Sequence, residues 1–222
     1  NFLSQTTPGV YPYYDGKFGY PSAPEESANA NNIVSYLYGT GGHDQESRFN
    51  TTLYATFNIY KGLSFESRFN YQTRFEERNS HTNPTDRWDF ATNTLRFASP
   101  TPDLLSTSYA FNKDYRITID QVLRYNTRIG NDHEIGALAG YNEWYFNYYD
   151  FSASKLGLID YTITTLGSAG NTSNNANGQE YDRAIRSWFG RVNYAYKGKY
   201  LVEGNLRYDG SSRFAKSNRW GY

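Results

Sequence analysis

The sequence predicts an all-β fold made of antiparallel hairpins that follow one another up and down. Apolar and polar residues alternate along several stretches of the chain, and short links that contain glycine separate these stretches into pairs. The composition agrees, because 23 Tyr, 14 Phe and 4 Trp occur among 222 residues that are only 38% hydrophobic. Many aromatic and few aliphatic side chains suit half-exposed strands better than helical cores.

The hairpin expected over residues 183–210 shows the pattern most clearly. Its residues of one parity, within 188–196 and 200–208, carry no charge. If residues 197–199 form a three-residue loop around Gly198, Tyr196 faces Tyr200 and Trp188 faces Tyr208. The aliphatic residues between these rings are Val192, Val202 and Leu206. Rings at both headgroup levels with aliphatic side chains between them are typical of a strand that crosses a bilayer.

Two other hairpins are expected upstream, over residues 47–76 and 114–151. Each has a short turn, at Tyr60-Lys61-Gly62 and at Gly130-Asn131-Asp132, and the strand after the second turn alternates least cleanly. Short turns that alternate with loops of tens of residues indicate an outer-membrane barrel with periplasmic turns and extracellular loops. The predicted fold class is therefore an antiparallel up-and-down transmembrane β-barrel wall.

The segments between the hairpins are interpreted as connections. Residues 1–46, rich in proline and glycine, read mainly as an extracellular loop with one short helix over Glu25–Tyr38. The stretches 76–103 and 152–182 lack alternation and read as long loops, and the tract Gly167–Gly178 is expected to be mobile. Another strand is expected to begin within Lys216–Tyr222.

Charged residues in the clean strands fall on the polar parity alone, and this parity is expected to face the lumen of the barrel. A lipid-facing Arg near the bilayer midplane costs about 2–4 kcal/mol, so a bilayer enforces this segregation. A soluble sheet with a dry core segregates its charges in the same way. The arginines are expected to form salt bridges with Glu66 and Asp120. The predicted lumen-facing residues are Glu66, Arg68, Arg74, Arg116, Asp120, Arg124, Arg128, Arg191, Glu203, Arg207 and Asp209.

Composition excludes several classes of function. Lys and Arg together number 22, as do Asp and Glu, so bulk charge gives no reason to expect nucleic acid as a partner. The chain has no cysteine and no methionine, which removes disulfides and thiolate metal sites. No apolar run is long enough for a transmembrane helix.

The residues from Ser187 to Tyr222 closely resemble the SusC/RagA family of TonB-dependent outer-membrane transporters. The resemblance is specific at Phe189-Gly190-Arg191-Val192-Asn193-Tyr194, at Lys199-Tyr200-Leu201 and at Arg207-Tyr208-Asp209-Gly210-Ser211-Ser212-Arg213-Phe214. Weaker matches at residues 61–65 and 133–141 extend it over most of the chain from about Phe49 onward.

This resemblance implies a barrel of about 22 strands with a plug in its lumen, located in the bacterial outer membrane among its lipids. It also implies energy supplied by TonB through an N-terminal plug region and a SusD-like surface lipoprotein that delivers oligosaccharides or, in some members, peptides. The sequence shows no plug domain and about six strands, so residues 1–222 are expected to be a part of the barrel domain.

Aromatic residues near the loop ends are the candidate substrate-binding residues, because a flat apolar ring with a polar rim suits a pyranose. The same rings can instead belong to the outer girdle or pack loops together. The candidates are Trp88, Trp144, Tyr148 and Tyr149.

No catalytic, cofactor or metal site is expected, and the chain is not predicted to be an enzyme. The three histidines, His43, His81 and His133, lie far apart in expected loops or turns, where solvation is the simpler role. The pairs Glu76-Glu77 and Asp86/Asp89 lack the spacing of a calcium loop. The main alternative is a soluble all-β carbohydrate-binding module, which predicts that the uncharged face meets another sheet. An enzyme on a β scaffold would need an acid/base pair that the sequence does not offer.

Overall fold

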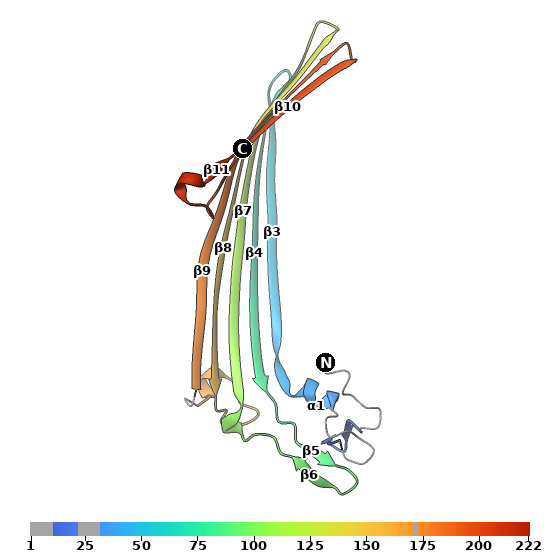
Figure 1. The fold of residues 1–222 in the computed structure, drawn as a ribbon, viewed down its shortest axis with the longest axis vertical. Coiled ribbons are helices and arrows are strands. Elements are labelled where there is room, and N and C mark those ends of the chain that lie inside the picture. Colours follow the sequence, from blue (N-terminus) through green and yellow to red (C-terminus); the bar gives the residue numbers. More distant parts are fainter. Residues whose placement is uncertain (1–10, 22–31, 171–172) are drawn as a thin grey trace. The chain divides into compact units, whose positions relative to one another are not determined.

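The structure is a computed structural model that describes residues 11–21, 32–170 and 173–222, and strands make up most of these residues (Figure 1). The chain divides into two compact units. The hairpin unit comprises residues 46–76, 112–150 and 179–222, and the loop unit comprises residues 1–45, 77–111 and 151–178. Among the described residues, no helix has the length and apolar character needed to cross a membrane.

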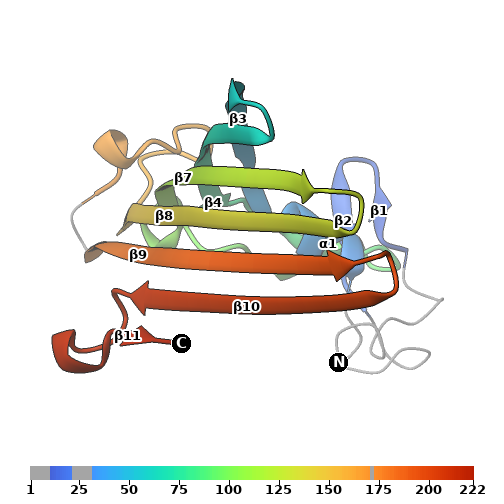
Figure 2. The same cartoon turned by 90° about the horizontal axis from the view of Figure 1, so that it is seen from above.

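Long strands form a seven-stranded sheet in which neighbours in the chain are neighbours in space, as an up-and-down fold requires. Its order is β11-β10-β9-β8-β7-β4-β3, and Figure 2 shows β7, β8, β9 and β10 side by side. The strands are β3 (Thr40–Tyr60), β4 (Leu63–Thr82), β7 (Ser106–Ile129), β8 (His133–Leu156), β9 (Ser173–Tyr196), β10 (Tyr200–Ser211) and β11 (Trp220–Gly221). The all-β prediction and the strand expected after Lys216 are confirmed.

The hairpin of β9 and β10 has the predicted register. Tyr196 pairs with Tyr200 and Trp188 pairs with Tyr208 in an antiparallel ladder. Lys197 and Gly198 have φ values of 54° and 65°, the left-handed region that glycine enters without steric cost. The turn between β3 and β4 is shorter than predicted, because Tyr60 ends β3 and Leu63 begins β4.

Most strands extend beyond the alternating segments, so the expected loops at 76–103 and 152–182 are partly wrong. Strand β4 continues to Thr82, β7 begins at Ser106, β8 continues to Leu156 and β9 begins at Ser173. Residues 173–178 of the tract expected to be mobile therefore belong to a strand. Neighbouring backbones satisfy each other's hydrogen bonds in a sheet whether or not the side chains alternate, so alternation underestimates strand length.

The glycine run at residues 39–42 is expected within a loop, but Gly39 caps helix α1 and residues 40–42 open strand β3. A Cβ atom at Gly42 would lie 2.0 Å from the carbonyl oxygen of Asn79, and one at Gly41 would lie 2.3 Å from the His81 ring. Glycine is present here because β3 and β4 approach closely. The short helix α1 covers Ile33–Tyr38, and the part of the expected helix over residues 25–31 lies outside the described residues.

The loop unit also contains a four-stranded sheet of short strands in the order β1-β2-β5-β6. Strand β2 pairs parallel with β5, and β5 pairs antiparallel with β6. A small apolar core of Leu105, Leu158 and Ala169, with Tyr161 packed on it, lies elsewhere in this unit. The four strands are β1 (Tyr13–Tyr14), β2 (Lys17–Gly19), β5 (Arg87–Asp89) and β6 (Thr94–Phe97).

The hairpin unit exposes large apolar side chains on one face of its sheet. Val192, Val202 and Leu206 are 55%, 67% and 70% exposed, although they occupy the positions that a soluble sheet would bury. We call this the uncharged face, and the opposite side, which carries Arg74, Arg124 and the other charged residues of that parity, the ionic face. Within the described residues of the hairpin unit, no second sheet packs on the uncharged face.

Candidate functional site

The uncharged face has a sharp border in strands β8 and β9, on the side away from the turns. Its aliphatic residues lie between the turn and a pair of rings, Tyr141 of β8 and Trp188 of β9, whose centroids are 4.6 Å apart. At the turn, Tyr196 stacks against Tyr200 with centroids 6.4 Å apart. About 9–11 residues of strand are needed to cross a bilayer, and the segment from Trp188 to Tyr196 is of that length.

Beyond this border the same face carries charges. Both the Nε and Nη2 atoms of Arg186 donate to Glu143 Oε1 at 3.0 Å. The Tyr145 hydroxyl donates to Asp182 Oδ1 at 2.6 Å, and Asn147 Nδ2 donates to the same oxygen at 2.8 Å. An apolar band therefore gives way to a polar one within two residues along each strand.

The ionic face is a network of paired charges. Arg74 Nε donates to Asp114 Oδ2 at 2.6 Å, and the side chain of Asp114 is only 7% exposed. Glu66 accepts from Arg68 at 3.3 Å and lies 3.9 Å from Arg124, so the salt bridges expected for Glu66 form. The arginine partner expected for Asp120 is wrong, because Asp120 Oδ1 accepts a hydrogen bond from Asn142 Nδ2 at 2.6 Å.

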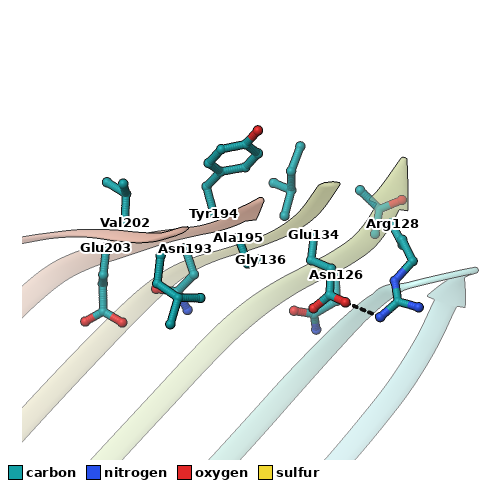
Figure 3. Close-up of a pocket in the computed structure, with 12 residues that line it drawn as sticks. Asn126, Arg128, Glu134, Gly136, Asn193, Tyr194, Ala195, Val202 and Glu203 are labelled. Carbon is teal, nitrogen blue, oxygen red and sulfur yellow. Dashed lines mark hydrogen bonds and ion pairs between the residues drawn. The ribbon is translucent and has the colours of Figure 1, made fainter. Parts of the chain in front are cut away.

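The predicted lumen-facing residues nearer the ends of the strands lie on the same face. Arg128 pairs with Glu134, and Arg207 Nε donates to Asp209 Oδ1 at 2.8 Å. Figure 3 shows Glu203 and Asn193 pointing to one side of the sheet, and Val202 and Tyr194 pointing to the other. These four residues, together with Arg128 and Glu134, line a hollow of about 670 Å³ near the turns. Asn193 Oδ1 is buried there without a hydrogen-bond partner in the structure.

Two of the predicted substrate-binding residues come together in one aromatic cluster on the ionic face. Trp144 stacks on Phe146 with centroids 5.9 Å apart and an interplanar angle of 6°. Tyr148 stacks on Tyr181 at 5.1 Å, and Phe146 lies 6.1 Å from Tyr181. We call Trp144, Phe146, Tyr148 and Tyr181 the aromatic cluster.

Arginines flank this cluster. The Arg116 guanidinium lies 5.2 Å from the Phe146 ring centroid, and the Arg183 guanidinium lies 4.6 Å from that of Tyr181. Such contacts hold cations against ring faces. Stacked rings with guanidinium groups beside them can hold a ligand that offers both apolar and hydrogen-bonding edges.

The other two predicted residues lie apart from this cluster. Tyr149 has the opposite parity to Tyr148 and is 39% exposed. Trp88 belongs to strand β5 of the loop unit, where Lys17 Nζ lies 4.1 Å from its ring centroid. Sequence reasoning missed Phe146 and Tyr181. Phe146 shares the parity of Trp144 and Tyr148, so the alternation could have found it, whereas Tyr181 lay in an expected loop.

No arrangement typical of a metal site is present among the described residues. They contain no group of three or more His, Asp and Glu side chains placed to hold a metal ion. The histidines lie in strands β3, β4 and β8, so their expected placement in loops or turns is wrong. His133 Nδ1 lies 2.7 Å from the Tyr194 hydroxyl. Asp89 Oδ1 accepts from the backbone of Ala91 and Thr92 in a turn.

Comparison of the sequence with known proteins gives relatives that are all TonB-dependent receptors. No family model matches the sequence. The TonB-dependent receptor P39 of Formosa agariphila is 26% identical over 179 residues, which cover 78% of this chain and 16% of that protein. The TonB-dependent receptor P26 of the same organism is 33% identical over 103 residues, 46% of this chain and 10% of that protein.

A short segment of higher sequence identity and the fold both give relatives of the same kind. The TonB-dependent receptor SusC of Bacteroides thetaiotaomicron is 57% identical over 35 residues, 16% of this chain and 4% of that protein. The structure of the RagAB peptide transporter superposes with a TM-score of 0.77 at 18% identity and covers 93% of this chain and 22% of that chain. The RagAB importer in its closed-closed state gives a TM-score of 0.73 at 20% identity, over 84% of this chain and 20% of that chain. This chain thus spans less than a quarter of the length of these relatives.

Proposed function

This chain is a segment of a TonB-dependent receptor of the SusC/RagA type, and we propose that it forms part of the barrel wall of a nutrient importer. TonB-dependent receptors reside in the bacterial outer membrane and are transporters, not enzymes. In this proposal the uncharged face meets lipid and the ionic face lines the plugged lumen. The short turns are periplasmic, and the long connections are extracellular.

The observation that carries the proposal is the exposed, ring-bordered band on the uncharged face. Val192, Val202 and Leu206 lie between the ring pair Trp188 and Tyr208 and the ring pair Tyr196 and Tyr200, as aliphatic side chains do in a hairpin that crosses a bilayer. Hydrocarbon solvates such side chains without a covering sheet. This reasoning favours a membrane segment over a soluble carbohydrate-binding module.

The proposed partners follow from the relatives. The relatives include the TonB-dependent receptor SusC and the RagAB complex, and RagAB is a peptide transporter. We expect a SusD-like lipoprotein to meet the extracellular side of the receptor and TonB to act through the plug region. The substrate is an oligosaccharide or a peptide.

The aromatic cluster supports a place for that substrate. Trp144 and Tyr148 belong to the ionic face but lie beyond the level of Tyr141 and Trp188, where the uncharged band ends. In the proposed orientation they line the extracellular mouth of the lumen. Tyr149 and Trp88 stay predictions as substrate contacts.

Two arginine substitutions in the full-length receptor test the proposed orientation. Val192 lies midway between the ring-bearing residues Trp188 and Tyr196, so Val192→Arg places a charge near the bilayer midplane. We expect it to lower the stability of the inserted receptor by about 2–4 kcal/mol, measured by urea unfolding in vesicles and by the loss of the heat-modifiable folded band on gels.

The matched control is Asn193→Arg, one residue along on the ionic face. Asn193 pairs directly with Glu203 of the neighbouring strand, so the new guanidinium meets a carboxylate, and we expect a change of less than about 1 kcal/mol. Equal losses from both variants would contradict the assignment of the faces.

A further inference from the structure

We propose that the loop between β10 and β11, residues 212–219, binds the phosphate groups of lipid headgroups at the membrane surface. Three cationic side chains lie in this short loop: Arg213, Lys216 and Arg219. Residues 210–222 contain no Asp or Glu, so no acidic neighbour in the sequence neutralises these cations. We call residues 212–219 the basic loop, and all of it belongs to the hairpin unit.

The three cationic side chains form no ion pair with any described residue. Arg213 and Lys216 are exposed, and the Nε atom of Arg219 is buried without a hydrogen-bond partner. A buried donor that lacks an acceptor is costly, and a phosphate oxygen would supply a charge-assisted hydrogen bond. The charge of the basic loop is therefore available to an anionic ligand.

The strands that lead into the basic loop differ from it, because their arginines are already neutralised. Arg207 Nε donates to Asp209 Oδ1 at 2.8 Å, and Arg186 Nη2 lies 3.0 Å from Glu143 Oε1. These arginines of β9 and β10 thus have carboxylate partners within the hairpin unit, whereas the cations of the loop after β10 have none. This difference indicates a ligand outside the described residues.

The basic loop returns the chain to the uncharged face. Trp220, the first residue of β11, pairs with Gly210 of β10, and a Cβ atom at Gly210 would lie 2.6 Å from the Trp220 ring. The same ring stacks on Tyr208, with centroids 5.0 Å apart and an interplanar angle of 16°. The loop therefore ends at the rings that border the uncharged face, on the side that we propose to meet lipid.

The distance along β10 places the basic loop at the level of lipid headgroups. Tyr208 pairs with Trp188 at the border of the uncharged face, and Ser212 follows Tyr208 by four residues. Four residues of a strand that rises about 3.4 Å per residue and is tilted by about 45° reach roughly 10 Å beyond this border. The polar headgroups form a layer roughly 5–8 Å thick on each side of the hydrocarbon core. The loop runs from Ser212 back to Trp220 and so passes through this layer.

Backbone hydrogen bonds fix both ends of the basic loop before any ligand arrives. Ser212 N donates to the carbonyl oxygen of Ala184 at 2.9 Å, and Ser212 Oγ accepts from Ala184 N at 2.9 Å. Ser211 N donates to the carbonyl oxygen of Arg219 at 3.0 Å. A preformed loop loses little conformational entropy on binding, which favours affinity.

An exposed ring completes the match to a lipid. Phe214 lies between Arg213 and Lys216 in the sequence and is 60% exposed. Aromatic and basic side chains in one short segment are typical of chains that lie at a membrane surface. A free phosphate ion would leave this ring in water, whereas a lipid also offers it an apolar surface. The site rests on the proposed function, because the basic loop lies at the headgroup level only if the uncharged face meets lipid.

The test uses the full-length receptor purified in detergent and titrated with lipid A, a glycolipid that carries phosphate groups. The second probe is the same lipid after enzymatic removal of its phosphates, and inorganic phosphate and hexa-aspartate are the competitors. Native mass spectrometry counts the bound lipid molecules and gives their affinity. We expect lipid A to bind about tenfold more tightly than its dephosphorylated form.

Substitutions make the test specific to the basic loop. Arg213→Gln and Lys216→Gln each remove the charge of an exposed side chain, and each should weaken the binding of lipid A about fivefold. The matched control is Lys199→Gln, which removes the charge of an exposed lysine in the turn before β10 and should leave the affinity unchanged. Phe214→Ser should weaken the binding of lipid A and of its dephosphorylated form by the same factor.

Three outcomes would overturn the site: both forms of the lipid bind equally, inorganic phosphate or hexa-aspartate binds more tightly than lipid A, or Lys199→Gln weakens binding as much as Lys216→Gln. Failure of the proposed function would look different, because Val192→Arg would then leave membrane insertion intact. Failure of this site alone would leave the Val192→Arg defect in place and abolish only the preference for the phosphorylated lipid.

Discussion

Strands β8 and β9 differ sharply between their turn-proximal segments and the segments that follow within the hairpin unit. From the turn to Tyr141 and Trp188, one face of the sheet is uncharged and the other is ionic. Beyond those rings, the first face carries Glu143, Arg186 and Asp182, while aromatic rings gather on the other face. The side-chain chemistry of both strands thus changes at the level where the proposed membrane boundary lies.

Packing at the junction of these two segments should be sensitive to added volume. A Cβ atom at Gly140 would lie 2.2 Å from the ring of Phe189 on the neighbouring strand. We expect Gly140→Ala to destabilise the receptor by about 1–3 kcal/mol through overpacking, measured by urea unfolding.

The control for this substitution is Gly204→Ala, because nothing lies within 4 Å of a Cβ atom at Gly204. It should be neutral or slightly stabilising. Adding Phe189→Leu to Gly140→Ala should recover part of the loss, and no recovery would show that the clash is not the cause.

The aromatic cluster should affect substrate uptake and not the insertion of the receptor into the membrane. Truncating Trp144 in the full-length receptor removes one stacked face of the aromatic cluster, and we expect about a tenfold loss in the initial rate of substrate uptake. The folded fraction should not change. The control is Tyr149→Ala, on the opposite face, which should leave uptake closer to normal, and equal losses would remove the cluster from the substrate path.

The ion pair just beyond the border distinguishes water from lipid. In water, Glu143→Gln should cost only about 0.2–1 kcal/mol, and the cost should shrink as salt concentration rises. In hydrocarbon, the unpaired Arg186 would cost about 3–5 kcal/mol and salt would have little effect. Unfolding in urea at low and high salt separates the two, and a large, salt-independent loss would move the membrane border outward.

The connection after β8 should respond to bulk pH, unlike the apolar band. Hydrogen bonds from the Thr162 hydroxyl and from its backbone N–H lower the pKa of Asp160 in the folded loop. This contribution to loop stability is therefore present above the ordinary Asp pKa and is lost as the pH falls through the lowered value. The protection factor of the Thr162 amide against hydrogen exchange should fall over that range, and Asp160→Asn should remove this pH dependence of the protection factor.

The comparison of the two segments also explains what the sequence could predict. The register of Tyr196 with Tyr200 and of Trp188 with Tyr208 was predictable, because the apolar band forces strict alternation and Gly198 marks the turn. The continuation of β9 back to Ser173 was not, because strands with polar groups on both faces carry no period-two signal. Backbone pairing alone extends them.

The residues of the candidate site were likewise predictable only where the strands alternate. The charged parity of the ionic face followed from alternation, including the partners of Glu66. Only Trp144 and Tyr148 of the aromatic cluster were predicted. Tyr181 contacts Tyr148 because two strand segments pair there, and these segments show no alternation of apolar and polar residues. The position of Trp88 depends on the pairing of β2 with β5, which places Gly19 opposite Trp88 and which residue spacing does not reveal.

The most direct measurement of the central claim is the depth of two adjacent side chains in a bilayer. Single cysteines replace Val192 and Asn193 in a full-length receptor otherwise free of cysteine, each carries a fluorophore, and the receptor is reconstituted into vesicles of brominated lipid. We expect strong quenching of the label at residue 192 and little at residue 193. Equal quenching at both positions, or stronger quenching at residue 193, would contradict the assignment of the uncharged face to the membrane.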